Sequence, residues 1–167
     1  MPPSSVSSLD PHELLISTNK QYFYVTCQKS NEIRVFDIAL EQVVQTVATA
    51  NYPLEMALAP GKNKLFVTCE YDTLNGAKGS VEVIDVNTYA KQNIKVGALP
   101  HGLAVDDSKN LLYVASRNIF SNGPAPHHSA ICSGRNGFVS YIDINTLQVK
   151  SKRTEVSVDP YSVAFRK

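Results

Sequence analysis

Residues 53–69, PLEMALAPGKNKLFVTC, decide the fold, because the same pattern occurs at two other places in the chain. Residues 11–27 read PHELLISTNKQYFYVTC and residues 100–116 read PHGLAVDDSKNLLYVAS, so the three segments align without gaps. Each opens with a proline and ends 16 positions later, at the close of a second apolar run. Such a repeat indicates one supersecondary unit that is copied along the chain.

A second apolar block follows each of these segments. The three blocks read IRVFDI, VEVIDV and VSYIDI and are centred on Asp37, Asp85 and Asp143. A fourth unit opens at Pro160 with PYSVAF. The repeat length of 42 and 47 residues in the first two units is typical of one blade of a β-propeller.

Each unit reads as four short strands that are rich in β-branched and aromatic residues and separated by turn formers. In the first unit we expect strands at about Leu14–Ser17, Tyr22–Cys27, Glu32–Ile38 and Val43–Val47. The second and third strands are apolar at nearly every position, which requires burial on both faces of the sheet. Blades stacked around an axis provide that burial. The sequence therefore predicts an all-β fold, a β-propeller of about three four-stranded blades plus the first strand of a fourth.

The repeats divide the chain into a polar N-terminal segment, residues 1–10, and propeller repeats, residues 11–167. The predicted blades are residues 11–52, 53–99 and 100–159, followed by a partial blade at residues 160–167. Propellers usually close with four to eight blades. An exposed blade face of roughly 500 Å² would forfeit about 12 kcal/mol at ~25 cal/mol per Å². We therefore expect the ring to be completed, by blades missing from this sequence (the preferred alternative) or by a homo-oligomer.

The stretches KLFVTC and VEVIDVNT of the second unit, with LPHGLAVDDSKNLLYVA of the third, resemble the YVTN-type (YncE-like) propeller repeat. The resemblance covers essentially residues 11–167. It implies relatives among exported bacterial and archaeal propellers, lactonase-like proteins, and the haem d1 and nitrous-oxide-reductase propellers. It also implies a periplasmic or extracellular location, although residues 1–10 lack the basic and apolar regions of a signal peptide.

The bulk composition narrows the range of partners. A formal net charge of +1 gives no electrostatic support for binding nucleic acid, so no nucleic-acid partner is predicted. No apolar run approaches the ~18 residues that a membrane span needs. The three cysteines, Cys27, Cys69 and Cys132, are too widely spaced for a disulfide framework. We expect Cys27 and Cys69 to be small buried thiols.

The length variation between repeats falls between the second and third strands. The second unit carries about 6 extra residues within Glu70–Gly79, and the third about 17 within Asn118–Gly137. This connection leaves the sheet on the same side as the connection between blades, and we call that side the loop face. Loops on one face of a repetitive scaffold usually carry its function. We expect a ligand or partner on the loop face, around residues 118–137.

All four histidines map to the loop face. His12 and His101 follow a blade-opening proline, whereas His127 and His128 lie in the long insertion shortly before Cys132. His127, His128 and Cys132, with His101 nearby, would supply ligands suited to copper, zinc or haem iron. The alternative is structural, because neighbouring side chains on an extended loop diverge and a histidine after proline often caps a turn.

The predicted ligand-binding residues are His101, Arg135 and Asn136. Arg135 could face an anionic ligand, whereas Asn136 and Gly137 together are a strong hairpin-turn signal. An aspartate ends the third strand of each unit. It is predicted to stabilise the following turn by accepting hydrogen bonds from backbone N–H groups rather than to act in catalysis. The sequence contains no GxSxG and no carboxylate dyad.

These observations favour a non-catalytic propeller scaffold that binds a small-molecule ligand or a protein partner through the loop face. The alternative is a metal- or haem-dependent redox protein, which the resemblance to the nitrous-oxide-reductase and haem d1 propellers implies. A lactonase-like hydrolase is a weaker alternative. No cofactor is certain; copper, zinc and haem are the candidates.

Overall fold

The computed structural model describes residues 9–76, 78–117 and 136–165 of the 167-residue chain. Within these ranges, three four-stranded antiparallel sheets account for all strands. The helical elements there are two short 3-10 turns, η1 (Pro60–Lys62) and η2 (Thr73–Asn75). No helix in the described part of the chain is long and apolar enough to cross a membrane.

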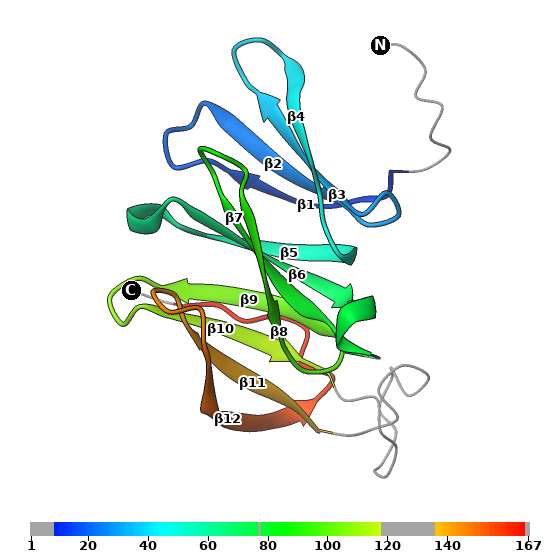
Figure 1. Cartoon of the computed structure of the whole chain (residues 1–167), viewed down its shortest axis with the longest axis vertical. Coiled ribbons are helices and arrows are strands. Elements are labelled where there is room, and N and C mark those ends of the chain that lie inside the picture. The colour runs from blue at the N-terminus through cyan, green and yellow to red at the C-terminus, as the bar shows by residue number, and fades with distance from the viewer. Residues whose placement is uncertain (1–8, 77, 118–135, 166–167) are drawn as a thin grey trace.

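Each sheet is a meander of four consecutive strands, which we call a blade. Blade 1 holds β1 (Pro11–Ile16), β2 (Tyr22–Cys27), β3 (Glu32–Asp37) and β4 (Gln42–Ala48). Blade 2 holds β5 (Asn51–Ala59), β6 (Lys64–Tyr71), β7 (Ser80–Asp85) and β8 (Lys91–Lys95). Blade 3 holds β9 (Pro100–Asp106), β10 (Leu111–Ser116), β11 (Asn136–Asp143) and β12 (Val149–Val158). Figure 1 shows the three sheets stacked in chain order, which confirms the predicted all-β architecture of propeller blades.

The start of the fourth blade is only partly formed. No strand is assigned to residues 160–165. The segment nevertheless lies against β9, because a Cβ atom added to Gly102 would come within 2.6 Å of the Cα atom of Ser162. β5 and β9 lie in the same way beside the first strand of the preceding blade. The segment thus occupies the place of an inner strand, without a further described strand to pair with.

Two apolar clusters hold the blades together, one at each interface. The cluster between blades 1 and 2 is formed by Tyr24, Ile33, Val35, Val47, Met56, Leu65, Val67 and Ile84. The cluster between blades 2 and 3 includes Phe66, Val81, Val83, Leu103, Leu112, Val114 and Ile142. Blade 2 therefore buries both of its faces, which explains why β6 and β7 are apolar without alternation.

The outer face of blade 1 is exposed. Leu14, Met56 and Leu103 occupy the same repeat position, yet their exposed fractions are 55%, 4% and 5%. Ile16, on the same face of β1 as Leu14, is also exposed. The face that receives the preceding blade in blades 2 and 3 is thus open in blade 1, and completion of the ring stays a prediction.

Two predictions about local structure are confirmed. In each blade the third-strand aspartate accepts bonds from the backbone N–H groups two and three residues later, at 2.8–3.1 Å. These bonds lower the pKa of Asp85 and Asp143. Cys27 and Cys69 are buried free thiols.

Candidate functional site

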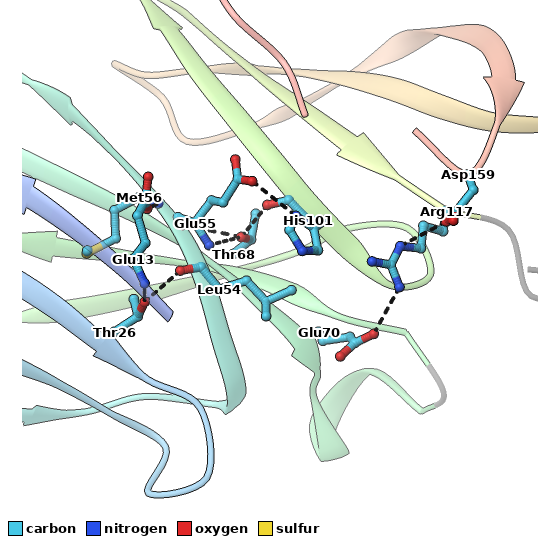
Figure 2. Close-up of polar contacts among 10 residues, drawn as sticks. All are labelled: Glu13, Thr26, Leu54, Glu55, Met56, Thr68, Glu70, His101, Arg117 and Asp159. Carbon is cyan, nitrogen blue, oxygen red and sulfur yellow. Dashed lines mark hydrogen bonds and ion pairs between the residues drawn. The ribbon is translucent and has the colours of Figure 1, made fainter. Parts of the chain in front are cut away.

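Each blade begins with an irregularity that removes backbone groups from the strand ladder. The register of β5 on β6 shifts between Pro53 and Met56, and β1 and β9 show similar shifts. The hydroxyl of Thr68 hydrogen-bonds two of these backbone groups: it accepts from the Glu55 N–H at 3.1 Å and donates to the His101 carbonyl at 2.6 Å. Thr26 makes the same two bonds one blade earlier, at 3.0 and 2.8 Å (Figure 2). One buried hydroxyl therefore connects blade 1 to blade 2, and another connects blade 2 to blade 3.

Carboxylates cross the same two interfaces. Glu55 of blade 2 places Oε1 3.2 Å from Nδ1 of His101 in blade 3, whose exposed fraction is only 2%. Glu13 of blade 1 accepts a bond from the backbone N–H of Met56 in blade 2 (Figure 2). The pKa of Glu13 is raised to about 7, chiefly by burial; the bond from Met56 lowers it, and the nearby Glu55 also raises it.

The second residues of the inner strands converge. The ring centroids of His12 and His101 lie 5.5 Å apart with an interplanar angle of 77°, although one histidine belongs to blade 1 and the other to blade 3. Burial, and then the neighbouring His101, lower the pKa of His12, which favours a neutral imidazole. The structure thus brings together the two histidines that follow a blade-opening proline.

Arg117 extends this cluster toward the C-terminal segment. Its guanidinium is buried, with Nε 3.0 Å from Asp159 Oδ1 and an Nη atom 3.6 Å from Glu70 Oε1 (Figure 2). It also lies 4.7 Å from the ring centroid of Tyr161, and the ring of Tyr161 lies 3.6 Å from that of His101. Arg117 therefore connects blades 2 and 3 to the start of the fourth repeat.

The insertion of blade 2 is connected to this network through Glu70, the ion-pair partner of Arg117. Asp72 holds its base, because its Oδ1 accepts from the Leu74 N–H at 2.8 Å and its own N–H donates to the Lys78 carbonyl at 3.0 Å. Leu74 is 78% exposed. Tyr71 of the same loop packs edge to face on Tyr52 at 5.9 Å, and both rings are exposed. We call Tyr52, Tyr71 and Leu74 the exposed patch.

The predicted site residues lie in different parts of the molecule, and several lie outside the described residues. His101 is buried in the network described above, whereas the side-chain amide of Asn136 donates to Glu155 at 2.8 Å, within blade 3. The predicted metal ligands of the long insertion and one predicted ligand-binding residue lie outside the described residues: His127, His128, Cys132 and Arg135. Among the residues that the structure describes, no three His, Cys, Asp or Glu side chains are grouped to hold a metal ion.

Sequence reasoning missed the residues that join the blades. Glu13 and Glu55 both stand two positions after a blade-opening proline, and that repetition was an available signal. Arg117 and Glu70 share a repeat position at the end of the second strand, where opposite charges in adjacent blades favour an ion pair. The role of Tyr161 had no signal, because it depends on contacts with His101 and Arg117 of blade 3.

The sequence matches no protein-family model and no curated protein. Among solved structures, the chain is similar to a candidate 6-phosphogluconolactonase from Bacteroides fragilis, with a TM-score of 0.66 and 16% identity, over 96% of this chain and 43% of that one. It is also similar to hydrazine synthase from Kuenenia stuttgartiensis, with a TM-score of 0.60 and 18% identity, over 94% and 53% of the two chains. A functionally unknown protein from Desulfotomaculum acetoxidans matches with a TM-score of 0.61 and 14% identity, over 89% and 43%.

The fold is that of β-propeller blades. These neighbours are propeller-like proteins, and at such identities the likeness concerns the fold alone. The chain spans about half the length of these solved chains or less.

Proposed function

We propose that the chain is a non-catalytic propeller scaffold that binds a protein or small-molecule partner through its loop face. The observation that carries the proposal is the insertion of blade 2, which exposes Leu74 by 78% and carries Tyr71, whose exposed ring packs on that of Tyr52. The base of this loop is fixed by Asp72, so the patch is positioned by a rigid scaffold. Aromatic side chains are enriched in protein interfaces, which supports a protein partner at the exposed patch.

A site-specific photo-crosslinker tests this proposal. We expect a benzophenone side chain at position 74, in the full chain expressed in its own host, to yield one discrete crosslinked species. Leu40 is the matched control, because it is 60% exposed on the β3–β4 turn, on the opposite face. The Tyr71→Ala exchange is expected to weaken crosslinking from position 74. Equal crosslinking from positions 40 and 74, or none from position 74, would refute the proposal.

A metal- or haem-dependent redox role is the second candidate. It is favoured by the proximity of His12 to His101, since the lowered pKa of His12 favours the ligating form, and by Glu55 Oε1 3.2 Å from Nδ1 of His101, where a carboxylate could orient a metal-ligating histidine. His127, His128 and Cys132 would complete such a site. Native mass spectrometry of the full chain with zinc or copper is expected to show a stoichiometric ion that the His12→Ala exchange removes. Metal-free protein without a visible haem absorption band would exclude this role.

Lactonase-like hydrolysis and export from the cytoplasm remain proposals from the sequence. A lactone hydrolysis assay that stays at background would exclude the first. Cell fractionation of the native protein addresses the second, and recovery in the cytoplasmic fraction would contradict it.

A further inference from the structure

A cavity of about 300 Å³ opens between blades 1 and 2, on the side opposite the loop face. It lies among three turns, which connect β1 to β2, β5 to β6 and β7 to β8. Small-ligand pockets typically measure about 300–1,000 Å³, so this cavity suits a ligand at the small end of that range. It shares no lining residue with the network of His101 and Arg117.

The chemistry of the cavity is polar but uncharged. None of the described residues that line it is an Asp, Glu, Lys, Arg or His. Its polar groups are hydroxyls and side-chain amides, including those of Asn63 and Asn87, and its apolar part includes Leu58 and Val86. Because burying a charge without a partner costs much free energy, these walls disfavour an ion. They favour a neutral ligand that forms several hydrogen bonds.

Tyr24 contributes a phenolic hydroxyl to the lining of this cavity. Its exposed fraction is 4%, and its ring belongs to the core between blades 1 and 2. Among the described residues none hydrogen-bonds its phenolic hydroxyl, and this hydroxyl is not one of the polar groups that are fully enclosed without a partner, so water or a ligand in the cavity can reach it. Burial raises the pKa of Tyr24, so the hydroxyl stays protonated at neutral pH. A ligand hydroxyl in the cavity would hydrogen-bond it in place of water.

The turn beside Tyr24 is already ordered. The Ser17 hydroxyl donates to Asn19 Oδ1 at 2.7 Å and accepts from the Tyr22 N–H at 3.0 Å. Asn63 lies opposite, and its carbonyl accepts from the Val86 N–H at 2.9 Å. The Ser17–Tyr22 turn and the backbone at Asn63 are therefore held in place without a ligand, which lowers the entropic cost of binding.

The corresponding space between blades 2 and 3 is different. Lys64 occupies the repeat position of Tyr22 there, and its Nζ crosses to the Ile144 carbonyl at 3.0 Å. Phe66 stands in place of Tyr24 and carries no hydroxyl. The uncharged cavity is thus a property of the particular residues of blades 1 and 2, not of the repeat.

We propose that this cavity binds a neutral, hydroxyl-rich ligand of about monosaccharide size, a saccharide or a polyol. The hydroxyl of Tyr24 and the side-chain amides of Asn63 and Asn87 exchange hydrogen bonds with the ligand hydroxyls. The ring of Tyr22 and the side chain of Leu58 pack against its apolar surface. The site goes beyond the proposed function, because it lies on the opposite face and needs no loop-face residue.

NMR titration of the ¹⁵N-labelled full chain tests the proposal with glucose, N-acetylglucosamine and myo-inositol as probes. We expect saturable shifts in the three turns around the cavity for at least one probe, and markedly weaker shifts for glucuronate and glucosamine, which are charged. Tyr24→Phe removes only the hydroxyl and is expected to weaken binding about tenfold, the effect of losing about 1.4 kcal/mol. Tyr113→Phe, the same change at the equivalent position of blade 3, is expected to leave binding unchanged.

Tyr22→Lys introduces the residue that blade 2 carries at this position and is expected to abolish binding. If this variant does not fold, Tyr24→Phe alone decides. The proposal is overturned if none of the three neutral probes binds, if the charged probes bind as tightly as the neutral ones, or if Tyr24→Phe binds like the unmodified chain.

Discussion

Replacing Thr68 with valine is expected to weaken the contact between blades 2 and 3. Valine keeps the branched shape of the side chain, so the change removes the hydroxyl and little else. That hydroxyl accepts from the Glu55 N–H at 3.1 Å and donates to the His101 carbonyl at 2.6 Å. Thr68 is fully buried, so water does not reach the hydroxyl that both groups use.

The expected magnitude follows from these two bonds. A buried backbone group left without its partner costs about 1–3 kcal/mol. Losing both bonds should therefore lower the free energy of unfolding by about 3 kcal/mol. For a chain of this size, 1 kcal/mol corresponds to a shift in Tm of about 2–4 °C, so we expect the Tm to fall by roughly 6–12 °C.

Urea unfolding of the full chain is best followed by circular dichroism, because the sequence contains no tryptophan. Thr26→Val is expected to cost a similar amount, since Thr26 makes the equivalent two bonds. Thr46→Val is the control, because Thr46 lies exposed on β4 and its exchange should change stability by less than about 0.5 kcal/mol. A Thr68→Val variant as stable as Thr46→Val would refute the assignment of these hydroxyls as ties between blades.

Three further predictions concern the same framework. The pKa of Glu13 is raised from 4.5 to about 7, so its contribution to stability is complete below pH 4.5 and is lost as the pH rises through about 7. The Glu13→Gln exchange should remove this loss of stability when Tm is measured from pH 5 to 8. A variant whose Tm depends on pH as that of the unmodified chain does would contradict the prediction. The Gly79→Ala exchange should destabilise the fold by about 1–3 kcal/mol, because the added Cβ atom would lie 2.3 Å from the Cys69 carbonyl oxygen. The Gly61→Ala exchange is the control, since its Cβ atom would meet nothing within 4 Å, and it should leave stability unchanged in the same urea titration. Burial raises the pKa of both Cys27 and Cys69, so a Cys132→Ser variant should react with a thiol reagent only after unfolding; rapid labelling of the native chain would show that these thiols are accessible.

The fold could be predicted because its signals are local and repeated. The strand at Tyr22–Cys27 has the predicted bounds, since turn formers flank an apolar run on both sides. β1 begins three residues earlier than predicted, at Pro11, because the irregularity after the proline pairs Pro11 with Cys27 across the strand. Periodicity within one strand does not carry that information.

The candidate site could be predicted only in part. His12 and His101 were placed on one face from their repeat positions alone, and their rings do meet. The ion pair of Arg117 with Glu70 joins residues 47 positions apart, and it depends on how two blades stack. The cavity beside Tyr24 is further from prediction, because its lining comes from three separate turns that meet only when the two blades are packed.

Blade 3 departs from the repeat at the positions that connect one blade to the next. Blade 3 has Gly102 and Ala115 where blades 1 and 2 carry a glutamate and a threonine, so it lacks both ties to the next blade. A glutamate at position 102 would clash, because its Cβ atom would come within 2.6 Å of the Cα atom of Ser162. Arg117 replaces the lost contacts through its ion pair with Asp159 and its position over Tyr161. The third interface therefore depends on one buried cation, whereas the first two depend on a hydroxyl and a carboxylate each.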